Sequence, residues 1–113
     1  MSAGWDRAEL ATAQCIAERP DDYVEATRSV LTDLMMLLRR SGRPAPSIEP
    51  GYLPTFVITW DEPEASNLQM EVFDDRVEVS RYFDGRTDIW YEPHAPGESF
   101  SEAFIRELPS AEA

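Results

Sequence analysis

A proline-rich segment divides this chain into two parts with different hydrophobic periodicity. Residues 43–54 contain four prolines, Pro44, Pro46, Pro50 and Pro54, and cannot form a regular helix because proline lacks an N–H donor and clashes with the preceding turn. We expect an extended elbow over residues 43–54. Apolar residues recur at helical spacing before it and alternate with polar residues after it. This switch predicts an α+β fold, with 1–113 as a single domain.

Two helices are predicted before the elbow. The first is expected over residues 5–19 and ends before a proline. The second is expected over residues 21–40, with Asp21 or Asp22 as its N-terminal cap and Glu25 in the capping-box position. Apolar residues at helical spacing form one stripe along this second helix: Val24, Val30, Leu31, Leu34, Leu37 and Leu38.

Four strands are predicted within residues 55–91, over 55–60, 67–73, 76–83 and 86–91. Two-residue turns between the last three strands fix an antiparallel register. That register predicts one buried face, covered by the second helix: Leu68, Met70, Val72, Val77, Val79 and Trp90, with Arg81 opposite Asp88 near its margin.

The other face of the predicted sheet is acidic at one end and aromatic at the other: Glu71, Phe73, Arg76, Glu78, Tyr82, Ile89 and Tyr91. A capping-box pattern at Ser99 and Glu102 predicts a short C-terminal helix over 99–108. Two arrangements remain open. The helix folds over the aromatic end, or it packs at the sheet edge and leaves Tyr82 and Tyr91 exposed as a docking surface.

The net charge of the chain limits the classes of molecule that it is expected to bind. The chain has 22 acidic and 10 basic residues, for a net charge of −12. A field of this sign repels nucleic-acid phosphates and anionic lipid, and it attracts basic surfaces. We therefore expect a basic protein partner, no direct nucleic-acid binding and no membrane association. Acidity that serves only solubility is the open alternative. With no signal-peptide pattern, the expected location is the cytoplasm.

The residues that usually carry chemistry are sparse. His94 is the single histidine and Cys15 the single cysteine, whereas zinc sites need several such ligands. The position of Cys15 in the first predicted helix indicates a small apolar side chain buried in the core and not a reactive thiol. No phosphate-binding glycine loop or serine nucleophile motif is present. We expect no metal site, no cofactor and no catalytic residues, and therefore a non-enzymatic protein.

One acidic constellation stands out between residues 61 and 78. In the predicted hairpin, Glu71 and Glu78 face each other directly, a like-charge pair that costs stability. Such a pair beside an acidic turn is typical of a surface for a cationic partner; the alternative is a tolerated pair on a solvated face. The candidate partner-binding residues are Asp61, Glu62, Glu64, Glu71, Asp74, Asp75, Glu78, Tyr82 and Tyr91.

Several short segments resemble small bacterial proteins that have a leading helix, a proline-rich elbow and an antiparallel meander. The similar segments are Pro44–Pro50, Ile58–Trp60, Leu68–Val72 and Val77–Val79, within Leu34–Tyr91. The resemblance implies this fold and carries over no functional residues.

Small acidic folds of this kind also look like immunity proteins, antitoxins and phage inhibitors of nucleic-acid enzymes, families that occlude an active site or imitate nucleic-acid charge. The leading hypothesis is a non-enzymatic domain that occludes or neutralises a basic surface of a toxin or nucleic-acid-handling enzyme. The alternative is a homodimeric accessory or chaperone-like protein that binds its partner through apolar surface. A third possible class is an enzyme or small-ligand sensor. In that case the sheet face would form the floor of a pocket lined by Trp60, Tyr82 and Trp90.

Overall fold

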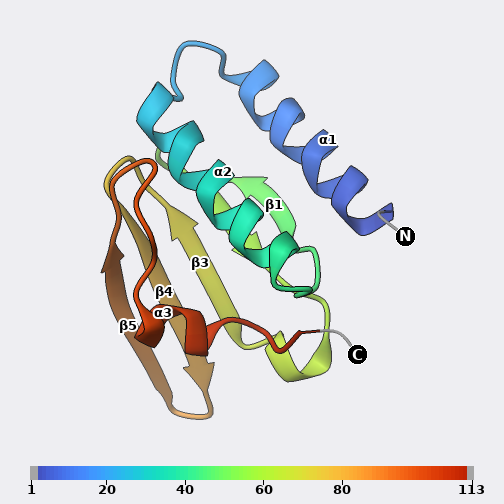
Figure 1. The fold of residues 1–113 in the computed structure, drawn as a ribbon, viewed down its shortest axis with the longest axis vertical. Helices are drawn as coiled ribbons and strands as arrows, with labels where there is room; N and C mark the ends of the chain where they lie inside the picture. The colour runs from blue at the N-terminus through green and yellow to red at the C-terminus, as the bar shows by residue number, and fades with distance from the viewer. Residues whose placement is uncertain (1–2, 112–113) are drawn as a thin grey trace.

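The computed structural model describes residues 3–111 and confirms the α+β class (Figure 1). Its elements, in chain order, are α1 (Ala3–Glu18), α2 (Glu25–Arg40), β1 (Ser47–Pro50), β2 (Phe56–Thr59), the 3-10 turn η1 (Pro63–Ala65), β3 (Leu68–Val72), β4 (Arg76–Phe83), β5 (Arg86–Pro93) and α3 (Glu102–Glu107). Within the described residues, no helix is both long and apolar enough to cross a membrane.

The five strands form one antiparallel meander in the order β1-β2-β3-β4-β5. The prediction of four strands missed β1, which lies inside the proline-rich elbow and pairs with β2. Prolines hold neighbouring residues in extended conformations. The sheet edge tolerates Pro50 because one side of an edge strand needs no hydrogen-bond donor.

The predicted register is confirmed. Val72 lies opposite Val77, and Val79 lies opposite Trp90. Arg81 also lies opposite Asp88, but each finds another ionic partner. Arg81 lies 3.5 Å from the Glu107 carboxylate of α3, and Asp88 lies 3.2 Å from Arg86 on its own strand.

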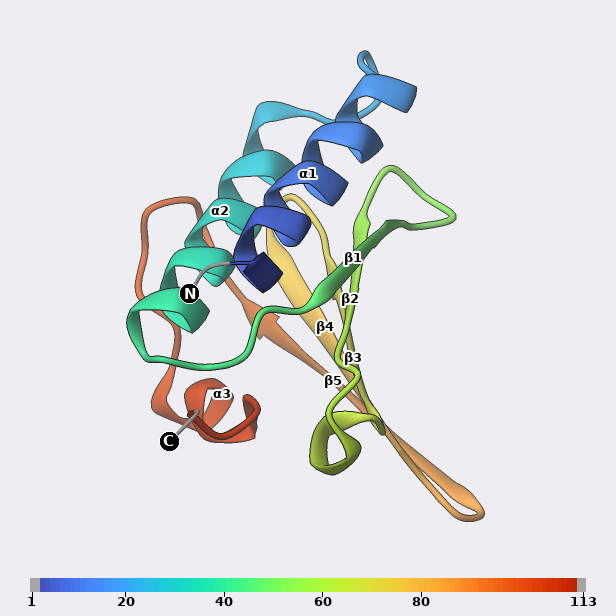
Figure 2. The same ribbon diagram turned by 90° about the vertical axis from the view of Figure 1, so that its right-hand side faces the viewer.

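All three helices lie on one side of the sheet (Figures 1 and 2). The predicted stripe of α2 supplies much of the core beneath them, with Val30, Leu34 and Leu38 fully buried. Val24 precedes the helix and is exposed. Trp60 is buried and its indole N–H donates to the Pro44 carbonyl at 3.1 Å, so it joins the elbow to the sheet.

The predicted start of α2 was four residues early. Asp21 and Asp22 lie exposed in the turn before the helix, which begins at Glu25 without a side-chain cap. The turn brings Tyr23 into the core. Its ring stacks on Phe56 at 4.4 Å, and its hydroxyl donates to the Thr55 carbonyl at 3.0 Å. Burial of this aromatic ring outweighs the local capping preference.

The C-terminal helix packs on the helical side of the sheet. Its cap is Ser101, whose hydroxyl accepts from the Phe104 N–H at 3.1 Å, so the prediction of Ser99 as the cap was wrong. Phe104 is buried in the core. Arg81, on the core face, donates to the Glu107 carbonyl at 3.0 Å. The arrangement in which this helix covers the aromatic end of the other face is therefore wrong.

Candidate functional site

The sheet face opposite the helices, here called the open face, carries a row of acidic side chains. Because the strands pair without offset along this line, five residues stand side by side across the whole sheet. We call this line the acidic row: Glu49, Val57, Glu71, Glu78 and Tyr91. Neighbouring strands lie about 4.8 Å apart, so the carboxylates are spaced at one or two strand widths.

A second row beside it is uncharged, and consists of Ser47, Thr59, Gln69, Ser80 and Ile89. Beyond that row, Tyr82 lies opposite Thr87 on the β4–β5 hairpin. Tyr82, Ile89 and Tyr91 are 46%, 58% and 54% exposed. The open face therefore combines a line of negative charge with an apolar margin on β4 and β5.

The predicted Glu71–Glu78 juxtaposition is present, and the structure shows how it is tolerated. The Glu71 carboxylate accepts a hydrogen bond from the Thr55 hydroxyl in the loop between β1 and β2. This bond gives Glu71 a structural role. Glu49 and Glu78 make no hydrogen bond or ion pair through their side chains within residues 3–111, so their charge is free for a partner.

Arg76 is the basic residue at the β4 end of the acidic row, and neighbouring side chains already contact its guanidinium. Its guanidinium lies 2.6 Å from the Asp75 carboxylate. It also sits over the Phe73 ring at 4.0 Å and near the Tyr91 ring at 5.4 Å. Asp74 remains exposed in the same turn. This end of the open face is consequently negative despite its arginine.

The predicted acidic constellation is divided in two. Asp61, Glu62 and Glu64 lie around η1 at one end of β3, whereas Asp74 and Asp75 lie beyond its other end (Figure 1). A strand rises about 3.3 Å per residue, so β3 separates the two groups by roughly 15 Å. The fold does not bring these two groups together into a single patch.

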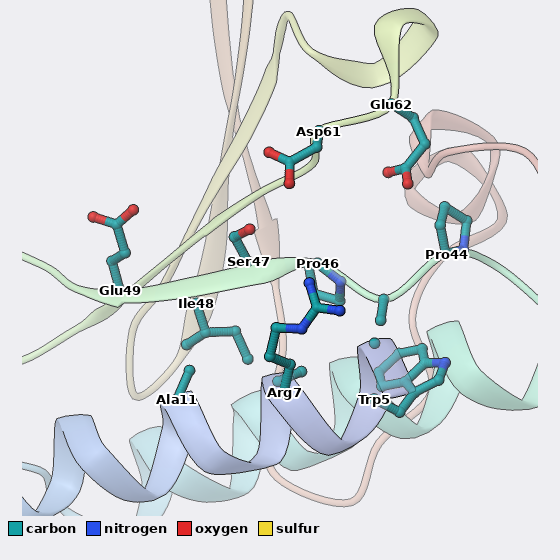
Figure 3. A pocket seen from close by; sticks show the side chains of 13 residues that line it. Trp5, Arg7, Ala11, Pro44, Pro46, Ser47, Ile48, Glu49, Asp61 and Glu62 are labelled. Carbon is teal, nitrogen blue, oxygen red and sulfur yellow. The ribbon is translucent and has the colours of Figure 1, made fainter. Parts of the chain in front are cut away.

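Asp61 and Glu62 instead border a groove of about 540 Å³ between α1 and β1 (Figure 3). Trp5, Ala11 and Ile48 supply its apolar walls, and Arg7 reaches from α1 toward the strand (Figure 3). One Glu62 carboxylate oxygen is buried without a hydrogen-bond partner among residues 3–111. The groove reaches the margin of the open face, because Ser47 and Glu49 of β1 also line it (Figure 3).

His94 has a structural environment that the sequence did not reveal. Its Nε2 lies 2.8 Å from the Asp33 carboxylate on α2, which also accepts from the Gly97 N–H at 2.7 Å. The imidazole is buried and stacks on Phe100 at 3.9 Å. These contacts tie the loop after β5 to α2. Within residues 3–111, no group of three or more His, Cys, Asp or Glu side chains could hold a metal ion.

Comparisons with protein-family models, with curated proteins and with solved structures each found no significant match.

Proposed function

We propose that this chain is a non-enzymatic protein-binding domain of the cytoplasm that uses its open face to occlude or neutralise a basic surface. The candidate partners are a toxin or a nucleic-acid-handling enzyme. The observation that carries the proposal is the acidic row, with Glu49, Glu71 and Glu78 aligned across a sheet face that no helix within residues 3–111 covers (Figure 2).

Charge and apolar surface have different roles in this proposal. Long-range attraction between a negative face and a basic partner raises the association rate more than it slows dissociation. Aromatic side chains that become buried at an interface contribute most to the lifetime of a complex. The acidic row serves the first role, and Tyr82 and Tyr91 at its margin serve the second.

The rigidity of the face favours this use. Backbone pairing between strands fixes the spacing of the residues that carry these carboxylates, so little backbone conformational entropy is lost when a partner docks. The bond from Thr55 holds Glu71 in place. A line of negative charges across a sheet face imitates a nucleic-acid backbone for an enzyme that binds phosphates.

The proposal is tested by affinity capture from a lysate of the organism that encodes the chain, at about 50 mM and about 500 mM NaCl. Screening shortens the reach of electrostatic attraction roughly threefold over this range. We expect a basic nuclease, toxin or nucleic-acid-handling protein that is retained at low salt and released at high salt. Capture of only salt-resistant or acidic partners would contradict the proposal.

A further inference from the structure

The two edges of the sheet differ in how well they are protected. β1 is four residues long and ends in Pro50, and Ile48 lies in the groove against α1 (Figure 3). β5 is eight residues long and has no neighbouring strand on its outer side within the described chain. A long unpaired strand presents a row of free backbone donors and acceptors to another chain.

The hydrogen-bond pattern identifies which residues of β5 face outward. Tyr82 on β4 donates its N–H to the Asn67 carbonyl at 2.9 Å, and the Asn67 side chain donates to the Tyr82 carbonyl at 3.1 Å. The backbone groups of Tyr82 therefore point away from β5. By the alternation of an antiparallel ladder, the N–H and C=O groups of Thr87, Ile89 and Tyr91 point out from the free edge.

We propose that β5 pairs with β5 of a second copy of this chain, antiparallel about a two-fold axis at Ile89. Ile89 then lies opposite Ile89 of the second copy, and Thr87 lies opposite its Tyr91. Each of these pairs exchanges both N–H···O bonds. This register pairs every outward-facing backbone N–H of the strand, since Pro93 has none. A shift of the axis by one residue leaves some of these groups without a partner, because Pro93 or the turn at Gly85 then stands opposite them.

The charges on β5 select the same register. With the axis at Ile89, Arg86 lies opposite Glu92 of the second copy, and the two-fold axis creates this pair twice. An axis at Asp88 places Asp88 opposite itself, and an axis at Trp90 places Asp88 opposite Glu92. Like charges directly across a sheet destabilise it and opposite charges stabilise it, so both neighbouring registers are penalised.

The side chains are already placed for these contacts. Ser101 donates from its N–H and its hydroxyl to the two oxygens of Glu92, both at 2.8 Å, which holds the carboxylate in position. Arg86 directs Nε toward Asp88 at 3.2 Å and places its guanidinium over the Phe83 ring at 4.4 Å, and its terminal nitrogens make no hydrogen bond within residues 3–111. Pairing also covers the exposed Ile89, which lies on the axis.

The two-fold axis runs perpendicular to the sheet, so both helical layers lie on one side and both open faces on the other. The dimer would display two acidic rows on one continuous surface. The inference rests on the edge geometry of β5 and is independent of the proposed function.

Two charge reversals test both the pairing and its register. In sedimentation equilibrium of the full chain at about 150 mM NaCl, we expect the wild type to dimerise at concentrations below about 1 mM. R86E places two glutamates opposite each other and E92R places two arginines opposite each other, so each variant alone should dimerise at least tenfold more weakly. An equimolar mixture should form a heterodimer, because both ion pairs return, one with its native sign (Arg86 with Glu92) and one reversed.

The control for R86E is Arg7→Glu, the same change of charge at an exposed position of α1, which lies across the molecule from β5 (Figure 1). Because E92R also removes the acceptor for Ser101, Ile89→Lys provides a second test at an exposed residue. Ile89→Lys lowers the net negative charge but places two ammonium groups on the axis, so we expect a monomer. A monomeric wild type up to about 1 mM, or dimer constants for R86E and Ile89→Lys that match Arg7→Glu, would overturn the inference.

Discussion

Gly51, in the loop between β1 and β2, is the position where a single methyl group should disturb the open face most. The residue is buried; its N–H donates to the Thr55 carbonyl at 2.9 Å, and its carbonyl accepts from Arg19 at 3.1 Å. A Cβ atom placed there would collide with the Thr55 hydroxyl and stand 3.0 Å from the Glu71 carboxylate. Gly51→Ala should therefore separate the two groups that anchor Glu71 in the acidic row.

The magnitude follows from the packing. Gly51 does not have a positive φ, so alanine meets no backbone penalty and the cost arises from contact alone. Forcing an extra carbon into a packed site typically costs about 1–3 kcal/mol. With an unfolding entropy of about 2.1 cal/mol/K per residue, 1 kcal/mol corresponds to about 4 °C in this chain. The expected fall in Tm is about 4–12 °C.

The assay is thermal and urea unfolding followed by circular dichroism, with a double-mutant cycle as the control. In a Thr55→Ala background the colliding hydroxyl is absent, so Gly51→Ala should cost at least about 1 kcal/mol less than it does in the wild type. A cost below about 0.5 kcal/mol in the wild type, or an equal cost in both backgrounds, would refute the packing argument.

Three further predictions concern stability. Tyr23→Phe removes the hydrogen bond to the Thr55 carbonyl and should cost about 1 kcal/mol in urea unfolding; no measurable cost would contradict the role given to this hydroxyl. Asp33→Ala leaves His94 and Gly97 without their acceptor. It should cost about 2–3 kcal/mol and speed amide exchange in residues 94–98, and unchanged exchange there would contradict the tie to α2. Burial raises the pKa of the Cys15 thiol and the pKa of the Tyr23 hydroxyl above their ordinary values. The unfolded chain therefore loses these protons first, so unfolding free energy should be constant near pH 7–8 and fall as pH rises past 9. Cys15→Ala should remove the part of this decrease in unfolding free energy that occurs at the lower pH. A pH profile identical to that of the wild type would contradict the role given to the Cys15 thiol.

The register of β3, β4 and β5 was predictable because it depends on local features. Two-residue turns and strict alternation place Val79 opposite Trp90 without reference to the rest of the chain. The strand β1 was not predictable in the same way. Its four residues lie among prolines, and only the presence of β2 beside them makes them a strand.

The composition of the open face was predictable, and its exposure was not. The register alone places Glu71 beside Glu78, but which side α3 covers depends on Phe104 packing into the core and on Arg81 reaching Glu107. Closeness in sequence also made the acidic residues look more clustered than they are in the fold. Asp61 and Asp75 are near in sequence, yet the length of β3 holds them apart. The Asp33–His94 contact joins residues 61 positions apart, and no local pattern signals it.

The central claim is that the open face, and not acidity in general, binds the basic partner. The most direct test measures the dissociation constant of the captured partner for wild type, for E49K/E78K and for E18K/D21K at one ionic strength. Glu49 and Glu78 lie on the acidic row, whereas Glu18 and Asp21 are exposed at the turn between α1 and α2. The net charge changes equally in both variants. We expect at least tenfold weaker binding for E49K/E78K, about 1.4 kcal/mol or more, and a change within about twofold for E18K/D21K. Equal weakening in the two variants, or undiminished binding by E49K/E78K, would contradict the assignment of the binding surface.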